Sequence, residues 1–169
     1  MRFLKLLPFL FFIATGVVLV GALYTDKQST SLEGKAMPPI ALDVFQGQVA
    51  GDGAKKTVLY NLFATWCTPC IAELPYLQKL SEEENVEIIG IAWKDDVEKL
   101  APWLERYGNP YTTIYLDPDG AYGISLGIRG LPESFIVDEA QTIRFHHGGP
   151  ITSSDLGDVI KAIHEAAGI

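Results

Sequence analysis

Apolar runs of strand length alternate with amphipathic stretches along most of this chain of 169 residues. Near-continuous apolar runs are typical of strands covered on both faces of a sheet, whereas apolar residues spaced by three or four positions are typical of helices. These patterns predict buried strands at 57–63, 86–93 and 111–116, and helices at 71–80 and 97–107. Such alternation favours a parallel sheet with helices packed against it.

The last third of the chain departs from this alternation. Residues 134–137 and 142–147 have the length of strands, and the four polar or small residues between them are typical of a hairpin turn. A final helix follows, with apolar positions from Leu156 to Ile163, and Thr152 or Ser153 is its expected N-cap.

Two shorter segments complete the predicted fold. Residues 40–45 are the candidate for a short first strand, and residues 121–128 for a short helix. Because the alternating units form a parallel core and the closing hairpin adds an antiparallel edge, we expect an α/β sandwich built on one mixed sheet flanked by helices.

The N-terminal segment has a different pattern. Residues 6–23 carry no charge and follow Arg2 and Lys5, which predicts a cytoplasmic N-terminus at 1–5 and a single transmembrane helix at 6–23. The alternative is a cleaved signal peptide, whose apolar region is normally shorter, about 7–15 residues. Under both interpretations the chain from Tyr24 onward is exported.

We interpret residues 24–36, which are polar, as a linker to an exported domain at 37–169. The net charge is −8, and the part from Tyr24 onward carries −10 once Arg2 and Lys5 are removed. A surface this acidic would repel phosphate backbones. Nucleic acid is therefore not an expected partner.

The only two cysteines, Cys67 and Cys70, are separated by two residues and lie between a predicted strand and a predicted helix. In this context a Cys-X-X-Cys pair indicates redox chemistry. A helix N-terminus favours the thiolate, so Cys67 is expected to attack a disulfide and Cys70 to resolve the mixed disulfide. Pro69 suits the first helical turn, and Trp66 is expected to cover one side of the pair.

The competing interpretation of the two cysteines is half of a zinc site. Zinc would need two further ligands, but the chain has no other cysteine, and His146 and His147 are adjacent rather than spaced as in a zinc finger. We therefore expect no metal and no cofactor beyond the cysteine pair itself.

Three polar residues are candidates for tuning the thiols. Asn61 lies on the strand that leads to the motif, Glu73 lies one helical turn after Cys70, and Glu133 follows Pro132. A carboxylate close to the thiols would raise their pKa values and could shuttle a proton. The alternative for each residue is an ordinary surface or hydrogen-bonded polar side chain.

Residues 63–70, which include Thr68-Pro69 between the cysteines, resemble the active site of the thioredoxin superfamily. Pro75 is similar to the kink proline of that family's first long helix, and Leu131-Pro132 to the loop that carries its cis-proline. Further stretches resemble the membrane-anchored cytochrome c biogenesis thiol:disulfide interchange proteins of the CcmG/DsbE type. These stretches are 61–73, 90–96, 108–111, 130–134 and 144–149.

There are departures from this pattern. Asn61 stands where ordinary thioredoxins carry a buried aspartate, which agrees with the CcmG/DsbE type. Thr68-Pro69 reverses the Pro-Thr order common in relatives, and Leu131 replaces an alanine.

The resemblance implies a thioredoxin-like fold and a protein held in the bacterial inner membrane with its catalytic domain in the periplasm. It implies reduction of the haem-attachment disulfide of apocytochrome c, with electrons from a membrane thiol reductase of the DsbD or CcdA type, alongside other cytochrome c maturation components. Leu131 and Pro132 would line the substrate groove, and Glu73 and Glu133 would lie near the thiols. The alternatives are a general periplasmic disulfide reductase or oxidant, and a non-enzymatic chaperone for apocytochrome or metal.

Overall fold

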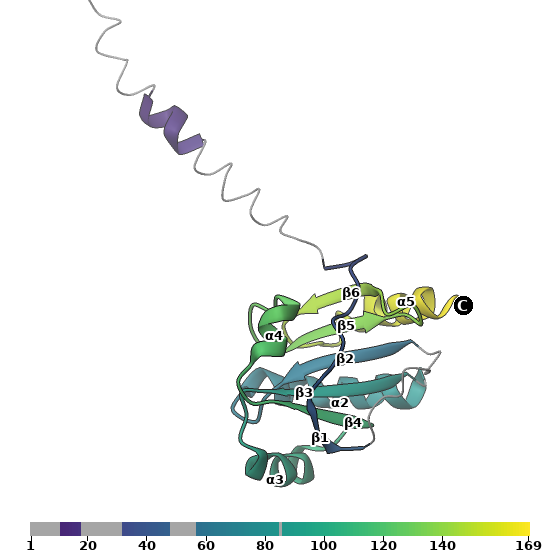
Figure 1. Cartoon of the computed structure of the whole chain (residues 1–169). Coiled ribbons are helices and arrows are strands. Elements are labelled where there is room, and N and C mark those ends of the chain that lie inside the picture. The colour runs from purple at the N-terminus through teal and green to yellow at the C-terminus, as the bar shows by residue number, and fades with distance from the viewer. Residues whose placement is uncertain (1–10, 18–31, 48–56, 85) are drawn as a thin grey trace, which may run out of the picture. The chain divides into compact units, whose positions relative to one another are not determined.

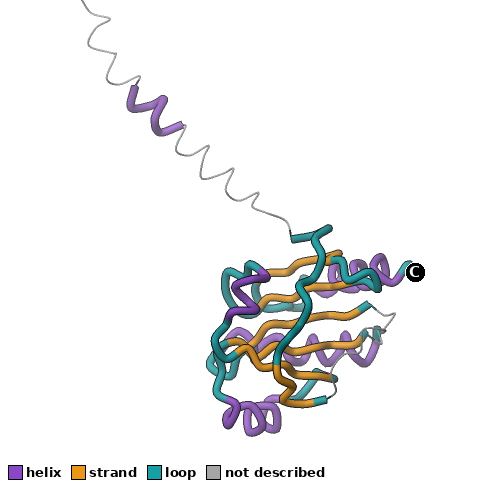
Figure 2. The backbone as a smooth tube through the Cα atoms, viewed as in Figure 1, coloured by secondary structure: helices purple, strands orange, loops and turns teal. Residues whose placement is uncertain are grey.

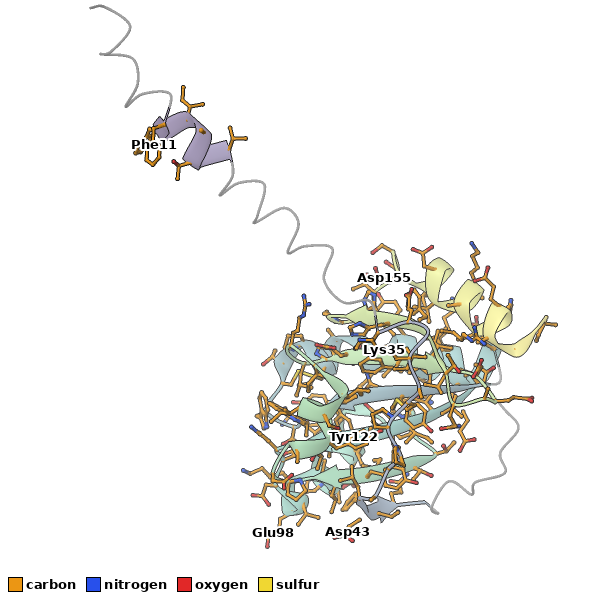
Figure 3. All side chains as sticks on the ribbon, turned by 45° about the horizontal axis from the view of Figure 1, so that its top comes forward. Phe11, Lys35, Asp43, Glu98, Tyr122 and Asp155 are labelled. Atoms are coloured by element: carbon orange, nitrogen blue, oxygen red, sulfur yellow. A yellow bond between two sulfur atoms is a disulfide. The ribbon has the colours of Figure 1, made fainter. Side chains whose placement is uncertain are left out.

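The computed structural model describes residues 11–17, 32–47, 57–84 and 86–169 (Figure 1). The chain divides into two units, Met1–Ser31 and Leu32–Ile169. In the first unit, residues 11–17 are helical and Phe11 is exposed (Figure 3). The rest of the transmembrane helix predicted at 6–23 lies outside the described residues. No helix within the described ranges is both long enough and apolar enough to cross a membrane.

The second unit is built on one six-stranded sheet (Figure 1). In spatial order its strands are β1 (Asp43–Gln46), β4 (Thr113–Asp117), β3 (Glu87–Trp93), β2 (Val58–Phe63), β5 (Glu133–Val137) and β6 (Ile143–Gly148). Strands β2, β3 and β4 are parallel, and β5 and β6 form an antiparallel hairpin whose first strand pairs with β2. The predicted mixed sheet is therefore confirmed. The sequence did not predict that β1 would pair antiparallel with β4.

Alternation of side chains along the strands divides the core between the two faces of the sheet. Leu59 and Phe63 of β2 face a cluster formed with α2 (Thr68–Glu83), α3 (Val97–Tyr107) and α5 (Leu156–Ala167). We call this side the helical face. It contains both cysteines, so the redox pair is part of the main hydrophobic core.

The opposite face is covered differently. Tyr60 and Leu62 of β2 pack there with α4 (Ala121–Leu126) and with the extended segment 32–42, which crosses the strands before β1 (Figure 2). The hydroxyl of Tyr122 in α4 donates a hydrogen bond to the carbonyl of Pro38, 2.9 Å away, and so links α4 to the segment 32–42. We call this side the strap face.

Two sequence predictions about helix ends are wrong. Helix α2 does not end at Leu80 but continues to Glu83, because Ser81 and the glutamates tolerate a solvated last turn and Lys79 pairs with Glu83. The N-cap of α5 is neither Thr152 nor Ser153 but Asp155, whose carboxylate turns back to accept a hydrogen bond from the backbone N–H of Thr152. Helix α2 stays helical through Pro75; the expected kink there stays a prediction.

Candidate active site

Cys67 and Cys70 form a disulfide at the junction between β2 and α2. Cys67 is the N-cap of α2, and its Sγ accepts a hydrogen bond from the backbone N–H of Cys70 at 3.3 Å. The prediction that Cys67 stands at the helix start is therefore confirmed. Its exposed fraction is 4%, against 1% for Cys70, so Cys67 is the slightly more accessible of two buried residues.

The residues beside the disulfide form an exposed rim. Thr68 and Pro69 occupy the first turn of α2 and are exposed. Trp66 is 57% exposed, and its indole N–H donates to the carbonyl of Lys94 at 3.1 Å. The ring of Trp93 lies 6.2 Å from that of Trp66. Trp66 is thus held at the rim, and its expected role as a cover for the pair stays a prediction.

Asp95, which sequence reasoning did not single out, anchors the chain just before the motif. Its carboxylate accepts hydrogen bonds from the hydroxyl, at 2.6 Å, and the backbone N–H of Thr65. Asp95 follows the end of β3, whose neighbour β2 leads into the motif. The loop between β2 and α2 is therefore tied to the adjacent strand as well as to its own helix.

Glu73 is fully buried on the face of α2 that also carries Cys70. The amide of Asn61 donates to its Oε1 at 2.9 Å, and the backbone N–H of Ile151 donates to its Oε2 at 3.1 Å. Burial raises the pKa of Glu73 to about 7, although these two hydrogen bonds oppose the shift. At neutral pH this carboxyl can therefore either give or accept a proton.

Asn61 is the centre of the buried polar network. Besides bonding Glu73, its amide donates to the hydroxyl of Ser134 on β5 at 3.0 Å. Its carbonyl oxygen accepts a hydrogen bond from the hydroxyl of Tyr111 at 2.8 Å. Burial, and after it the charge of Glu73, raises the pKa of Tyr111 well above its ordinary value, so its hydroxyl remains a donor.

Tyr111 is held in place by aromatic packing. Its ring stacks on that of Phe63, with ring centres 4.7 Å apart. A Cβ on Gly90 would lie 2.9 Å from the Phe63 ring and 3.0 Å from the Tyr111 ring. The absence of a side chain at Gly90 therefore makes room for the ring pair that presents the Tyr111 hydroxyl to Asn61.

The Leu131–Pro132 peptide bond is cis. Glu133, the next residue, pairs with Leu62 of β2, so the loop enters the sheet at the end where β2 continues toward Cys67. Leu131 packs against the cluster that contains both cysteines. The backbone N–H of Gly149 donates to the carbonyl of Pro132 at 2.9 Å and ties this loop to the end of β6.

Glu133 is buried, but its contacts differ from those of Glu73. Its Oε1 accepts hydrogen bonds from the backbone N–H groups of Arg129, at 2.6 Å, and Gly130, at 3.1 Å. Its Oε2 lies 2.7 Å from Nε2 of His146. Burial alone would raise the pKa of Glu133, but the hydrogen bonds from His146, Arg129 and Gly130 outweigh it and lower the pKa.

The two carboxylates expected near the thiols lie on opposite faces of the sheet. Ser134, whose hydroxyl bonds Asn61, points to the helical face with Glu73. Its neighbour Glu133 must point to the strap face, because successive residues of a strand alternate. The structure therefore does not bring Glu133 and Glu73 together into one acidic pair.

Four residues of this site were not predicted from the sequence: Asp95, Tyr111, Ser134 and His146. Tyr111 and Ser134 had a signal, since each lies in a stretch that resembles the CcmG/DsbE type, but no local pattern assigned them a polar partner. His146 also lies in such a stretch, 144–149, but was weighed only as a zinc ligand or as an exposed strand end. Among the residues that the structure describes, no group of three or more potential ligand side chains could hold a metal ion.

Comparison with known proteins agrees with this geometry. The Redoxin family model matches residues 32–160. The thiol:disulfide interchange protein DsbE of Escherichia coli K12 is 34% identical over 97% of this chain and 95% of its own length. The DsbE of Pseudomonas fluorescens biotype C is 35% identical over 98% of this chain and 95% of its own.

Solved structures support the fold. A Chlorobium tepidum protein assigned as a thiol:disulfide interchange protein DsbE superposes with a TM-score of 0.69 over 80% of this chain and 97% of its own, at 20% identity. At that identity the likeness supports the thioredoxin-like fold alone. With the disulfide at the N-terminus of α2 and identities of 34–35% over nearly the whole chain, this protein belongs to the DsbE family of thiol:disulfide interchange proteins and is a thiol:disulfide oxidoreductase.

Proposed function

We propose that this oxidoreductase reduces the disulfide in the haem-attachment motif of apocytochrome c during cytochrome c maturation. Residues 6–23 would anchor it in the bacterial inner membrane with residues 37–169 in the periplasm. A membrane thiol reductase of the DsbD or CcdA type would supply electrons, and other maturation components would act beside it. The observation that carries the proposal is the Cys67–Cys70 pair at the start of α2, within stretches typical of the CcmG/DsbE type.

The reaction has two exchange steps. The Cys67 thiolate attacks one sulfur of the substrate disulfide, forms a mixed disulfide and releases the other substrate sulfur as a thiolate. The Cys70 thiol then loses its proton and attacks Sγ of Cys67, which releases the second substrate sulfur. The substrate is reduced by two electrons, and this chain is left with the Cys67–Cys70 disulfide seen in the structure.

Glu73 fits the role of proton acceptor in the second step. It lies three residues after Cys70 on the same buried face of α2. Because burial raises its pKa to about 7, it can take up the Cys70 proton near neutral pH and release it afterwards. Donors would regenerate the dithiol by reversing the same two steps.

The test is to trap the substrate in cells. A full-length Cys70→Ser variant keeps the attacking thiol but cannot resolve the mixed disulfide, so it should accumulate covalently bound to apocytochrome c, which mass spectrometry would identify. The control is the Cys67→Ser/Cys70→Ser double variant, which should trap nothing. A broad range of unrelated periplasmic proteins in the trap would favour a general reductase. Cargo that still binds the double variant would favour the non-enzymatic chaperone.

The direction of electron flow needs a separate measurement, because it depends on the reduction potential and not on the motif. Equilibration of the purified protein with glutathione buffers should give a reducing potential. A value near about −120 mV, that of a strong periplasmic oxidant, would contradict the reductase function.

A further inference from the structure

Both oxygens of the Glu133 carboxylate are engaged, one by the backbone that leads into the cis-proline loop and the other by a side chain of β6. Oε1 accepts two backbone hydrogen bonds, from Arg129 and Gly130, and Oε2 contacts the ring of His146. The carboxylate is buried on the strap face. It therefore fixes the backbone of the two residues that precede Leu131.

His146 is itself fixed by the sheet. It pairs in register with Phe135 on β5, and the two rings stack with centres 4.5 Å apart and planes inclined by 2°. Its side chain is only 23% exposed. The strand pairing and the stacking together hold Nε2 at 2.7 Å from Oε2 of Glu133.

The contacts form a connected chain from β6 to the loop. His146 orients Glu133, Glu133 holds the N–H groups of Arg129 and Gly130, and the next residues are Leu131 and cis-Pro132. Leu131 packs against the cluster that contains Cys67 and Cys70. A change at His146 would thus reach a loop residue that borders the cluster containing the disulfide, without touching either sulfur.

We propose that His146 is a positioning residue for polypeptide substrates: through Glu133 it holds the loop 129–132 in the conformation that receives the chain around a substrate disulfide. The reacting sulfurs must be held in line for exchange, and a polypeptide can be held only by contacts outside the sulfurs. A small disulfide has no such chain to hold and does not depend on the loop. The proposal rests on thiol–disulfide exchange at Cys67, not on the identity of the protein substrate.

The test compares two substrates with the reduced full-length protein. One is a peptide closed by a disulfide between cysteines three residues apart, and the other is the small aromatic disulfide 5,5′-dithiobis(2-nitrobenzoic acid). His146→Phe keeps a flat ring against Phe135 but removes the nitrogen that contacts Glu133. We expect the KM for the peptide to rise about tenfold, which is the size of losing one hydrogen bond to a charged group. The kcat for the peptide and the rate with the small disulfide should stay within about twofold, as expected when the peptide loses binding that is equal in the ground state and the transition state.

Two variants complete the design. His146→Arg restores an N–H donor to Glu133 and should return the KM to within about threefold of the wild-type value. His147→Phe changes the adjacent residue, which lies on the other face of β6, and should leave both substrates unaffected.

The proposal is overturned if His146→Phe leaves the peptide KM unchanged, if it slows both substrates equally, or if it shifts the reduction potential of the Cys67–Cys70 pair. Should His146→Phe fail to fold, His146→Ala serves instead, because it removes the same nitrogen and lets water reach Glu133. The same rise in peptide KM is expected, and an unchanged KM would overturn the proposal. Failure of the apocytochrome c trap would leave this result untouched, because neither substrate here is a cytochrome.

Discussion

The side-chain amide of Asn61 donates a hydrogen bond to the carboxylate of Glu73 over 2.9 Å, in the core layer that also contains the disulfide. This bond joins β2, which leads into the Cys-X-X-Cys motif, to α2, which begins with it. An amide in this position donates to the carboxyl group without adding a second negative charge, so the Glu73 carboxyl can titrate near neutral pH.

Glu73 should make the stability of the oxidised protein fall as pH rises. The pKa of Glu73 is raised from 4.5 to about 7 in the folded state, so between these values the folded state binds more protons than the unfolded one. Its contribution is therefore fully favourable below pH 4.5 and is lost as pH rises to about 7. At about 1.4 kcal/mol per pKa unit, the loss is about 3 kcal/mol.

Glu73→Gln removes this titration. Urea unfolding measures this effect. From pH 5 to pH 8 the free energy of unfolding of the variant should rise by about 3 kcal/mol relative to that of wild type. Glu83→Gln, at an exposed position of the same helix, serves as the control and should follow wild type. A wild-type pH dependence in Glu73→Gln would contradict the raised pKa.

Tyr111→Phe should destabilise the protein by about 1–3 kcal/mol, since it leaves the buried carbonyl oxygen of Asn61 without the donor it has at 2.8 Å. The matched control is Tyr107→Phe, because Tyr107 is partly exposed at the end of α3. That change should remain within about 0.5 kcal/mol. Chemical denaturation measures both, and equal effects would argue against the role of the buried hydroxyl.

Gly90→Ala should lower the free energy of unfolding by about 1–3 kcal/mol, because the new methyl group would lie within 3.0 Å of the rings of Phe63 and Tyr111. Both rings are buried and stacked, so neither can move without disturbing the core. Gly148→Ala is the control: it also lies in a strand, and nothing stands within 4 Å of its would-be Cβ. Thermal unfolding should separate the two variants, and a wild-type midpoint for Gly90→Ala would refute the crowding.

In the reduced protein, Cys67 should be alkylated by iodoacetamide more than tenfold faster than Cys70 at pH 7. The N-cap position favours the Cys67 thiolate, which also accepts the N–H of Cys70, whereas Cys70 is buried in the first turn. Mass spectrometry of the digested protein measures the two rates. In guanidinium the preference should disappear, and equal rates in the folded state would contradict the assignment of Cys67 as the attacking thiol.

Local patterns in the sequence were sufficient for most of the architecture. The spacing of apolar residues reflects the periods of strands and helices, so it located nearly every element and the parallel core of β2, β3 and β4. The place of Cys67 at the start of α2 followed from the same local order of strand, motif and helix. Helix ends were less predictable, as the N-cap of α5 at Asp155 illustrates, because several polar residues there compete for one capping position.

Only the tertiary structure determined which side chains of the site are hydrogen-bonded to one another. Asn61 meets Tyr111, 50 positions away, and Ser134, 73 positions away, only because β5 pairs with β2 and the segment before β4 folds against it. The raised pKa of Glu73 depends on burial by these elements, which no local pattern encodes. Because side chains alternate along a strand, the side chain of Glu133 lies on the strap face, where it contacts His146 and not Glu73. The sequence therefore determined where the two sulfurs lie and what reaction they perform. The packing of distant segments determined which groups surround them, because side-chain partnership depends on distance in space and not on separation along the chain.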